Sequence, residues 1–219
     1  MNYPIGVSKW ELDTPALLVD LDAMERNIAR METFVREASA GRVRMRPHCK
    51  THKTPEIALK QIAAGAIGIT CQKVGEAEVM AAGGVRDILI SNQIVGSTKI
   101  ARLMKVAKQA DVMVCVDDAH NVADLSAAAT AAGVTLRVLV EVNHGMNRCG
   151  TEPGEPTLEL ARRVADAPGL RFMGIQAYEG HTVMIPDYAE RKRKTEQALA
   201  IGMETKALLE DNGLEVPIF

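Results

Sequence analysis

The chain has few aromatic residues, with three Phe, three Tyr and one Trp among its 219 residues. Proteins that bind single-stranded nucleic acid stack bases on such rings, and a formal net charge of −2 offers no excess of positive charge for phosphates. No apolar run approaches the length of about 20 residues that crosses a membrane, and residues 1–15 lack the apolar core of a signal peptide. We therefore expect no nucleic-acid partner and no membrane partner.

Paired cysteines are also missing. No C-x-x-C spacing occurs, and the cysteines lie in or beside apolar, strand-like runs. These residues are Cys49, Cys71, Cys115 and Cys149. Reduced thiols in a cytoplasmic protein are the favoured interpretation, and disulfides are the alternative.

Strand-like and helix-like stretches alternate along the whole chain. Strands are predicted at residues 16–21, 42–48, 66–71, 87–91, 111–116, 136–142, 170–178 and 216–219. Helices are predicted at residues 23–38, 55–64, 97–109, 121–132, 156–167 and 188–212. Several strands are apolar on both faces, as buried parallel strands are, and glycines stand at plausible C-terminal positions of helices. Those glycines are Gly65, Gly83, Gly133 and Gly213.

Strict alternation with about eight strands predicts an α/β fold, a TIM-type (β/α)8 barrel with a parallel sheet. A doubly wound sheet is the main alternative, but no Gly-x-Gly-x-x-Gly motif opens a helix. Hydrophobic residues make up 47% of the chain, and no linker rich in Gly, Ser or Pro divides it. We therefore expect one domain.

Residues 46–53, with the sequence Arg-Pro-His-Cys-Lys-Thr-His-Lys, form the most informative segment. Read with a period of two, Arg44, Arg46, His48 and Lys50 share one face of a strand. A lysine surrounded by cations loses its proton more easily, and only the neutral amine attacks a carbonyl. The pattern indicates a lysine that bonds covalently to an aldehyde, with a solvated strand edge as the alternative.

Polar residues gather where predicted strands end. They occupy residues 48–53, 91–93, 141–150 and 176–181. Connections at the opposite ends of the strands, such as residues 63–66 and 131–134, consist of small apolar residues. TIM barrels carry their active sites at the carboxyl ends of the strands. This asymmetry predicts an active-site face, and the ordinary polarity of loops is the alternative.

Four phrases carry a family resemblance. They are Asp-Thr-Pro-Ala at residues 13–16, the lysine segment at 46–53, Asn-Arg-Cys-Gly at 147–150 and Gln-Ala-Tyr-Glu-Gly at 176–180. In this order the chain resembles the barrel domain of the D-threonine aldolase/D-serine dehydratase family, from about residue 12 to residue 218. The resemblance implies a pyridoxal 5′-phosphate (PLP)-binding barrel over residues 1–219, of the alanine racemase N-terminal type and incomplete at the eighth βα unit.

The resemblance assigns the covalent bond with PLP to Lys50, a choice that spacing alone leaves open between Lys50 and Lys53. The period-two alternation of the strand also favours Lys50, because it places Lys50 on the basic face. Lys53 is expected to open the next helix with a solvated side chain. Tyr178 matches the family tyrosine at the pyridine nitrogen, and Arg148 matches the arginine beside the cofactor ring. The alternative for Tyr178 is a ring packed beneath a loop, and the alternative for Arg148 is a surface salt bridge.

Three histidines are expected in or near the cofactor pocket. His52 is assigned to proton transfer, and His48 and His181 to cofactor binding, each with a structural hydrogen bond as the alternative. Asn143 and His144 stand where relatives often carry an acidic residue. We therefore expect no carboxylate behind Arg148.

The resemblance implies a PLP-dependent lyase for a β-hydroxy D-amino acid. Aldol cleavage of D-threonine or 3-hydroxy-D-aspartate is favoured, and dehydration of D-serine or 3-hydroxyaspartate is the main alternative. A PLP carrier without catalysis and an amino-acid racemase are further alternatives. The family also implies a possible homodimer.

The chain stops at residues 216–219, which are predicted to begin the eighth strand. Relatives continue with a glycine-rich phosphate loop, a last helix and a C-terminal β domain that carries the ligands of a divalent metal. We expect that domain to be absent from this chain, and no metal site within residues 1–219. The chain by itself is therefore expected to be weakly active or inactive.

Overall fold

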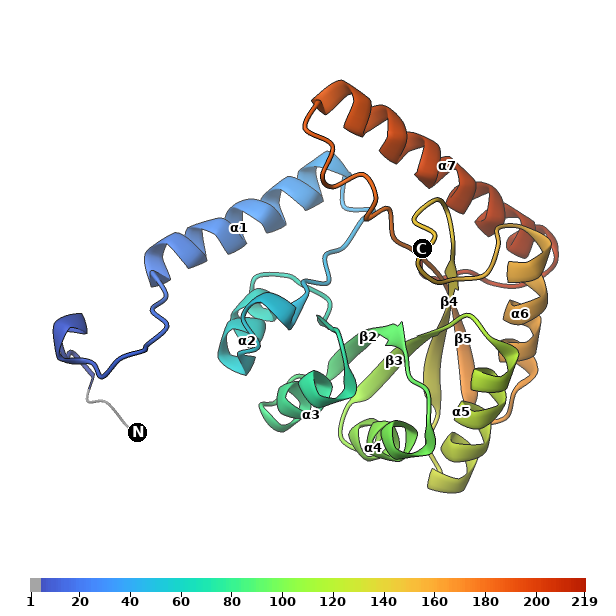
Figure 1. Cartoon of the computed structure of the whole chain (residues 1–219), viewed down its shortest axis with the longest axis horizontal. Coiled ribbons are helices and arrows are strands. Elements are labelled where there is room, and N and C mark those ends of the chain that lie inside the picture. Colours follow the sequence, from blue (N-terminus) through green and yellow to red (C-terminus); the bar gives the residue numbers. More distant parts are fainter. Residues whose placement is uncertain (1–4) are drawn as a thin grey trace. The chain divides into compact units, whose positions relative to one another are not determined.

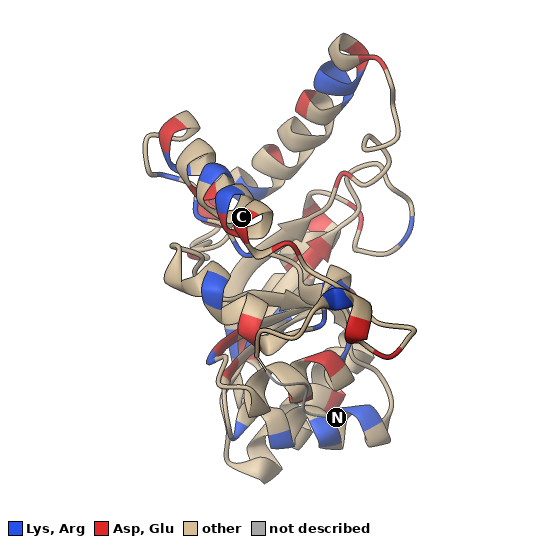
Figure 2. Ribbon diagram, turned by 90° about the vertical axis from the view of Figure 1, so that its left-hand side faces the viewer, with Lys and Arg blue, Asp and Glu red and all other residues tan. Residues whose placement is uncertain are grey.

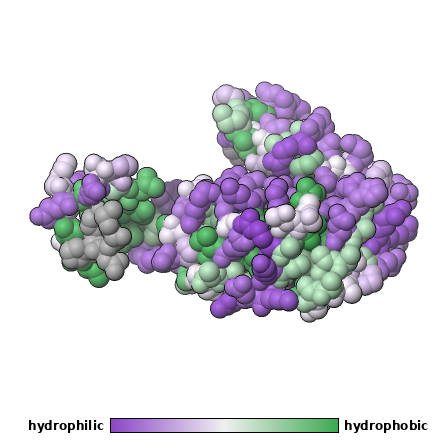
Figure 3. Space-filling view, turned by 60° about the horizontal axis from the view of Figure 1, so that its bottom comes forward, coloured by the Kyte–Doolittle hydropathy of each residue, from purple (hydrophilic) through white to green (hydrophobic). Residues whose placement is uncertain are grey.

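The computed structural model describes residues 5–219, and the chain divides into two compact units after residue 44. The first unit contains a short 3-10 helix, η1 (Lys9–Glu11), and one long helix, α1 (Leu21–Ala38). Apolar side chains are exposed on this unit and appear as green areas in Figure 3. Leu17 and Leu18 are among them.

The predicted first strand, residues 16–21, is wrong. Residues 16–20 are exposed and have no regular secondary structure, and no ladder partner for them exists among the described residues. The Asp20 side chain instead accepts a hydrogen bond from Ala23 N at 2.9 Å, so Asp20 caps a helix that begins at Leu21. A strand is stable only when its backbone groups pair, and an N-terminal cap commits this stretch to the helix.

The second unit alternates parallel strands with helices. Its strands are β1 (Ile69–Cys71), β2 (Asp87–Gln93), β3 (Asp111–Val116), β4 (Leu136–Val142) and β5 (Leu170–Ala177). Its helices are α2 (Pro55–Ala63), α3 (Val74–Ala82), α4 (Ser97–Ala107), α5 (Ala119–Ala132), α6 (Glu155–Asp166) and α7 (Tyr188–Asp211), with a 3-10 turn, η2, at Cys49–Thr51. The strands pair in sequence order, β1-β2-β3-β4-β5, so every crossover returns to the adjacent position. That order is typical of a barrel and differs from the reversing order of a doubly wound sheet.

The two predicted strands that flank this sheet shrink to single bridges. His48 pairs with Thr70 beside β1, and Ile218 pairs with Gly174 beside β5. Both flanking segments contain a proline, Pro47 and Pro217, whose nitrogen has no hydrogen to donate to a ladder. The described residues therefore form a five-stranded parallel sheet with one bridge at each side.

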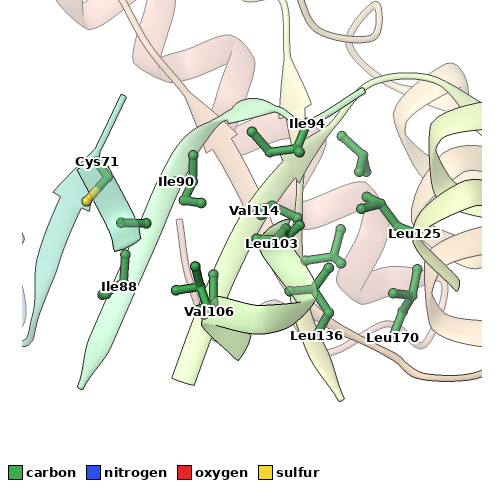
Figure 4. Packing of buried hydrophobic residues seen from close by; sticks show 14 of the residues in the cluster. Cys71, Ile88, Ile90, Ile94, Leu103, Val106, Val114, Leu125, Leu136 and Leu170 are labelled. Carbon is green, nitrogen blue, oxygen red and sulfur yellow. The ribbon is translucent and has the colours of Figure 1, made fainter. Parts of the chain in front are cut away.

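The core lies between the sheet and its helices. Figure 1 shows α3, α4, α5 and α6 along one face of the sheet, and Figure 4 shows Ile88 and Val114 in one layer with Leu103 of α4. Leu103 is completely buried. Burial of a leucine side chain contributes about 1.5–3 kcal/mol relative to exposure, so this layer holds the βα units together. The opposite face of the sheet carries a smaller cluster, formed by Leu89, Met113, Cys115 and Leu139.

An ion network closes the amino-terminal edge of the sheet. Asp87 accepts hydrogen bonds from Arg46 Nη1 at 2.9 Å and Arg137 Nη2 at 2.6 Å. Burial works to raise the pKa of Asp87, but the two guanidinium groups outweigh it and hold the pKa below its usual value. Gly68 is required here, because a Cβ atom would lie 2.9 Å from Asp87 Cβ.

Charged residues of both signs are interspersed along the ribbon in Figure 2, in keeping with the small net charge. Within residues 5–219, no helix combines the length and the apolar character that a bilayer crossing requires.

Candidate active site

Polar side chains at the carboxyl ends of the strands form a connected chain of hydrogen bonds. Asn92 Nδ2, on β2, donates to Gln72 O after β1 at 3.4 Å. Gln93 Nε2 donates to Asp117 Oδ2 after β3 at 3.2 Å and to Glu141 Oε2 on β4 at 2.8 Å. Polar residues from two of the segments predicted to form the active-site face therefore lie on one edge of the sheet, and their role as an active site stays a prediction.

Lys50 lies on this edge, but in a 3-10 turn and not in a strand. The turn η2 begins directly after the bridge at His48, and His48 Nδ1 accepts a hydrogen bond from Lys50 N at 3.2 Å. The predicted alternation of side chains, which placed Lys50 on one strand face with Arg46 and His48, therefore does not extend to residue 50. The Lys50 residue is exposed, whereas its neighbour Cys49 is completely buried.

The predicted row of cations beside Lys50 is also wrong. Arg46 is neutralised by Asp87 at the amino-terminal edge of the sheet. Burial, followed by the charge of Lys50, lowers the pKa of His48, so its imidazole is neutral at pH 7. The turn itself, and not a row of cations, distinguishes Lys50 from other surface lysines.

Lys53 does not begin the next helix, because α2 begins at Pro55, although its side chain is exposed as predicted. Lys53 has a positive φ of 51° and forms an ion pair with Glu76 in the first turn of α3. Glu76 is 6% exposed and also accepts a hydrogen bond from Gln72 N at 2.6 Å. Burial works to raise the pKa of Glu76, but Lys53 and the Gln72 N–H outweigh it and lower the pKa.

Arg148 and Tyr178 lie together on the same edge. The Arg148 guanidinium lies 5.3 Å from the centre of the Tyr178 ring, and Arg148 Nη2 lies 3.4 Å from Glu141 Oε1. Glu141 is almost completely buried. The expectation that no carboxylate supports Arg148 is therefore wrong, since Glu141 supplies one from within β4.

Loop geometry brings His181 to the same region. Gly145, in the loop that carries Arg148, has a φ of 125°, and a Cβ there would lie 3.2 Å from His181 Nε2. Gly180 leaves room for Tyr178, because a Cβ at that position would lie 2.8 Å from Tyr178 Cζ. The structure thus places Arg148, Tyr178 and His181 in adjoining loops after β4 and β5.

His52 takes part in the local structure of the lysine segment. Its Nδ1 accepts a hydrogen bond from Thr54 N at 3.0 Å, just before α2, and its Nε2 is buried without a hydrogen-bond partner among the described residues. Burial lowers the pKa of His52, so the ring is neutral at pH 7. The proton-transfer role of His52 stays a prediction.

Four polar residues of this edge were given no individual role from the sequence, although Gln93 and Glu141 lie within the predicted polar segments 91–93 and 141–150. Glu76, Gln93, Asp117 and Glu141 connect the lysine turn with Arg148. Glu141 carries the clearest signal, since it is the one acidic residue within the apolar run 136–142. Asp117 directly follows the end of a buried strand.

The profile of the family "Alanine racemase, N-terminal domain" matches residues 19–219. The chain belongs to this family. The α/β barrel type predicted for this alanine racemase N-terminal domain is thereby confirmed, although the described sheet has only five strands.

Three similar proteins share this domain. The 3-hydroxy-D-aspartate aldolase of Paracoccus denitrificans (strain Pd 1222) is 43% identical over 211 residues, which cover 95% of this chain and 54% of the relative. The crystal structure of D-threonine aldolase from Filomicrobium marinum has a TM-score of 0.89 and 50% identity, covering 94% of this chain and 55% of that one. The D-threo-3-hydroxyaspartate dehydratase from Delftia sp. HT23 has a TM-score of 0.83 and 30% identity, with 95% and 54% covered. The chain spans about half the length of each of these relatives.

Proposed function

We propose that this alanine racemase N-terminal domain is the PLP-binding part of a lyase that cleaves a β-hydroxy D-amino acid by the aldolase reaction. The observation that carries the proposal is the exposed amine of Lys50 on the same sheet edge as the Arg148–Tyr178 pair. Support also comes from the two aldolases, which are more similar to this chain than the dehydratase is.

The residues of this edge fit PLP. Lys50 would offer a primary amine to the aldehyde, and Arg148, paired with the buried Glu141, would offer a cation to the ring oxygen. Tyr178 would offer its phenol to the pyridine nitrogen. When bound, PLP supplies an acceptor for the electrons of a bond that breaks beside the amino group of the substrate.

The remaining work falls to groups that move or hold protons. His48 and His52 are neutral at pH 7, and the Nδ1 of each already accepts a backbone hydrogen bond, from Lys50 N and Thr54 N, so either ring can accept a proton from a substrate hydroxyl only after that hydrogen bond is given up. We assign this transfer to His52, and we assign His48 and His181 to the walls of the cofactor pocket. Removal of the hydroxyl proton favours cleavage of the Cα–Cβ bond, which gives an amino acid and an aldehyde.

Dehydration is the second function to test, because the Delftia dehydratase has the same fold at 30% identity. That reaction gives a keto acid and ammonia in place of glycine and an aldehyde. Incubation with D-threonine, PLP and a divalent metal distinguishes the two by their products. Formation of L-allo-threonine, the Cα epimer of D-threonine, without cleavage would instead support a racemase, and PLP binding without any product would support a carrier.

The family further supports a set of proposals about the complete protein. We propose that a C-terminal β domain holds the divalent metal, that two copies form a homodimer and that the 219-residue chain turns over substrate more slowly than a chain with that domain. Four cysteines without disulfides support a reducing compartment such as the cytoplasm.

The direct test of PLP binding is spectroscopic. We expect the chain to develop a visible absorption band with PLP, and we expect Lys50→Ala to lose it. A band of equal strength in Lys50→Ala would refute the assignment of Lys50.

A further inference from the structure

A buried carboxylate lies directly behind the turn that carries Lys50. Glu76 forms an ion pair with Lys53 Nζ, accepts a hydrogen bond from Gln72 N at 2.6 Å and lies 4.0 Å from Cys49 Sγ. Cys49 is the first residue of η2, and Lys53 is the second residue beyond the end of η2. Glu76 therefore contacts the segment on both sides of Lys50, from a different βα unit.

The segment needs such an anchor because its backbone is unfavourable in isolation. Lys53 has a φ of 51°, in the left-handed region that residues with a Cβ atom rarely occupy. Conformations of this kind persist when surrounding contacts hold them in place. The contacts at this position are the Lys53–Glu76 ion pair and the hydrogen bond from Lys53 N to Cys49 O at 2.7 Å.

Glu76 is itself well placed to remain charged. It lies in the first turn of α3, where the free N–H groups of the helix favour an anion, and no side chain caps that helix end. The side chain of Glu76 is 6% exposed, whereas that of Lys53 is 58% exposed. The pair thus joins a fixed buried charge to a side chain on the surface.

We propose that Glu76 and Lys53 are positioning residues that hold the η2 turn so that the amine of Lys50 is presented to the aldehyde of PLP. The inference rests on the proposed function, since it gives the anchor a purpose only if Lys50 bonds to PLP. Neither residue is assigned a chemical step.

The same helix provides a matched control. Glu78, two residues further along α3, forms an ion pair with Arg102 of α4. Glu78 and Arg102 are both more than a third exposed, and neither lies next to the lysine segment. Loss of that pair removes a charge contact from α3 without touching η2.

The test compares Glu76→Gln, Lys53→Gln and Lys53→Arg with Glu78→Gln in the 219-residue chain. Two quantities are measured: the apparent dissociation constant of PLP from its visible band, and the yield of PLP trapped on Lys50 by borohydride. We expect Glu76→Gln and Lys53→Gln to weaken PLP binding about tenfold or more. A substitution outside the reacting groups that misplaces a reacting group by about 1 Å can cost about a hundredfold. Lys53→Arg should restore most of the affinity, and Glu78→Gln should leave it within about twofold of the wild type.

A double variant, Lys53→Gln with Glu76→Gln, tests whether the two act as one unit. We expect it to bind PLP no more weakly than either single variant, because a shared interaction is lost only once. Thermal melting of each variant separates positioning from loss of the fold, since the anchor predicts weaker PLP binding in chains that remain folded.

The outcomes separate the inference from the function on which it rests. If the wild type is not labelled at Lys50, the proposed function fails. If the wild type is labelled but Glu76→Gln and Glu78→Gln bind PLP equally well, the proposed function stands and the positioning role is overturned. The same holds if Lys53→Arg is as weak as Lys53→Gln.

Discussion

Replacement of Glu141 by Ala should weaken both the domain and its affinity for PLP. The carboxylate is almost completely buried and has three neighbours: Gln93 Nε2 at 2.8 Å, Cys149 Sγ at 3.0 Å and Arg148 Nη2 at 3.4 Å. Alanine would leave these groups without their acceptor at the centre of the polar edge. Glutamine keeps the shape of the side chain and one acceptor oxygen but removes the charge.

The magnitude follows from these contacts. The Arg148 contact is discounted, because its side chain is 49% exposed and solvent screens the interaction. Loss of a buried acceptor costs about 1–3 kcal/mol, so we expect Glu141→Ala to destabilise the chain by about 2 kcal/mol. For a chain of this size that corresponds to a fall in Tm of about 4–8 °C.

The assay combines thermal melting with titration of PLP in the visible range. We expect Glu141→Gln to melt closer to the wild type than Glu141→Ala does, while both bind PLP about tenfold more weakly or worse because Arg148 is no longer fixed. Glu159→Ala, at an exposed position on α6, is the control and should change the free energy of unfolding by about 0.5 kcal/mol or less. If Glu141→Ala matched Glu159→Ala in both measurements, the supporting role of Glu141 would be refuted.

Three other predictions concern the core, the ion network and the Tyr178 loop. Leu103→Ala removes a completely buried side chain and should cost about 2–5 kcal/mol in urea unfolding, whereas Val79→Ala, at a half-exposed position, should cost far less; equal losses would contradict the assigned core. The folded-state pKa of Asp87 is lowered, so its contribution to stability is present above its unfolded value of about 4 and is lost as the pH falls through the folded pKa. The stability difference between wild type and Asp87→Asn should therefore shrink on acidification, and a difference that does not change with pH would count against the network. Gly180→Ala should displace Tyr178 and weaken PLP binding with little change in Tm, and unaltered binding would show that Tyr178 does not need this space.

The buried strands were predictable because their sequences are apolar on both faces. β3 and β4 have the predicted bounds, 111–116 and 136–142, and β5 ends one residue earlier than predicted. α3 was missing from the predicted helices, because Val74–Ala82 is short and largely buried and therefore shows little contrast between its faces. The predicted strands at residues 16–21 and 42–48 failed where local chemistry, a helix cap and a proline, competes with pairing.

The gathering of polar segments at the carboxyl edge of the sheet was predictable, but the local geometry of the lysine segment was not. The position of Lys50 on the carboxyl edge followed from the polar ends of the strands. The prediction that Lys50 shares a strand face with His48 was wrong, because η2 turns the chain directly after His48. The partner of Lys53 could not be found by spacing, since Glu76 lies 23 residues away in another βα unit. Contacts across units depend on packing, which a single sequence does not state.

Borohydride reduction of the chain with bound PLP, followed by peptide mapping, tests the assignment of Lys50 most directly. We expect the modified lysine to lie in the peptide that contains residues 46–53 and to be Lys50, with no label in Lys50→Ala. Modification of Lys53, of a lysine elsewhere or of none would contradict it.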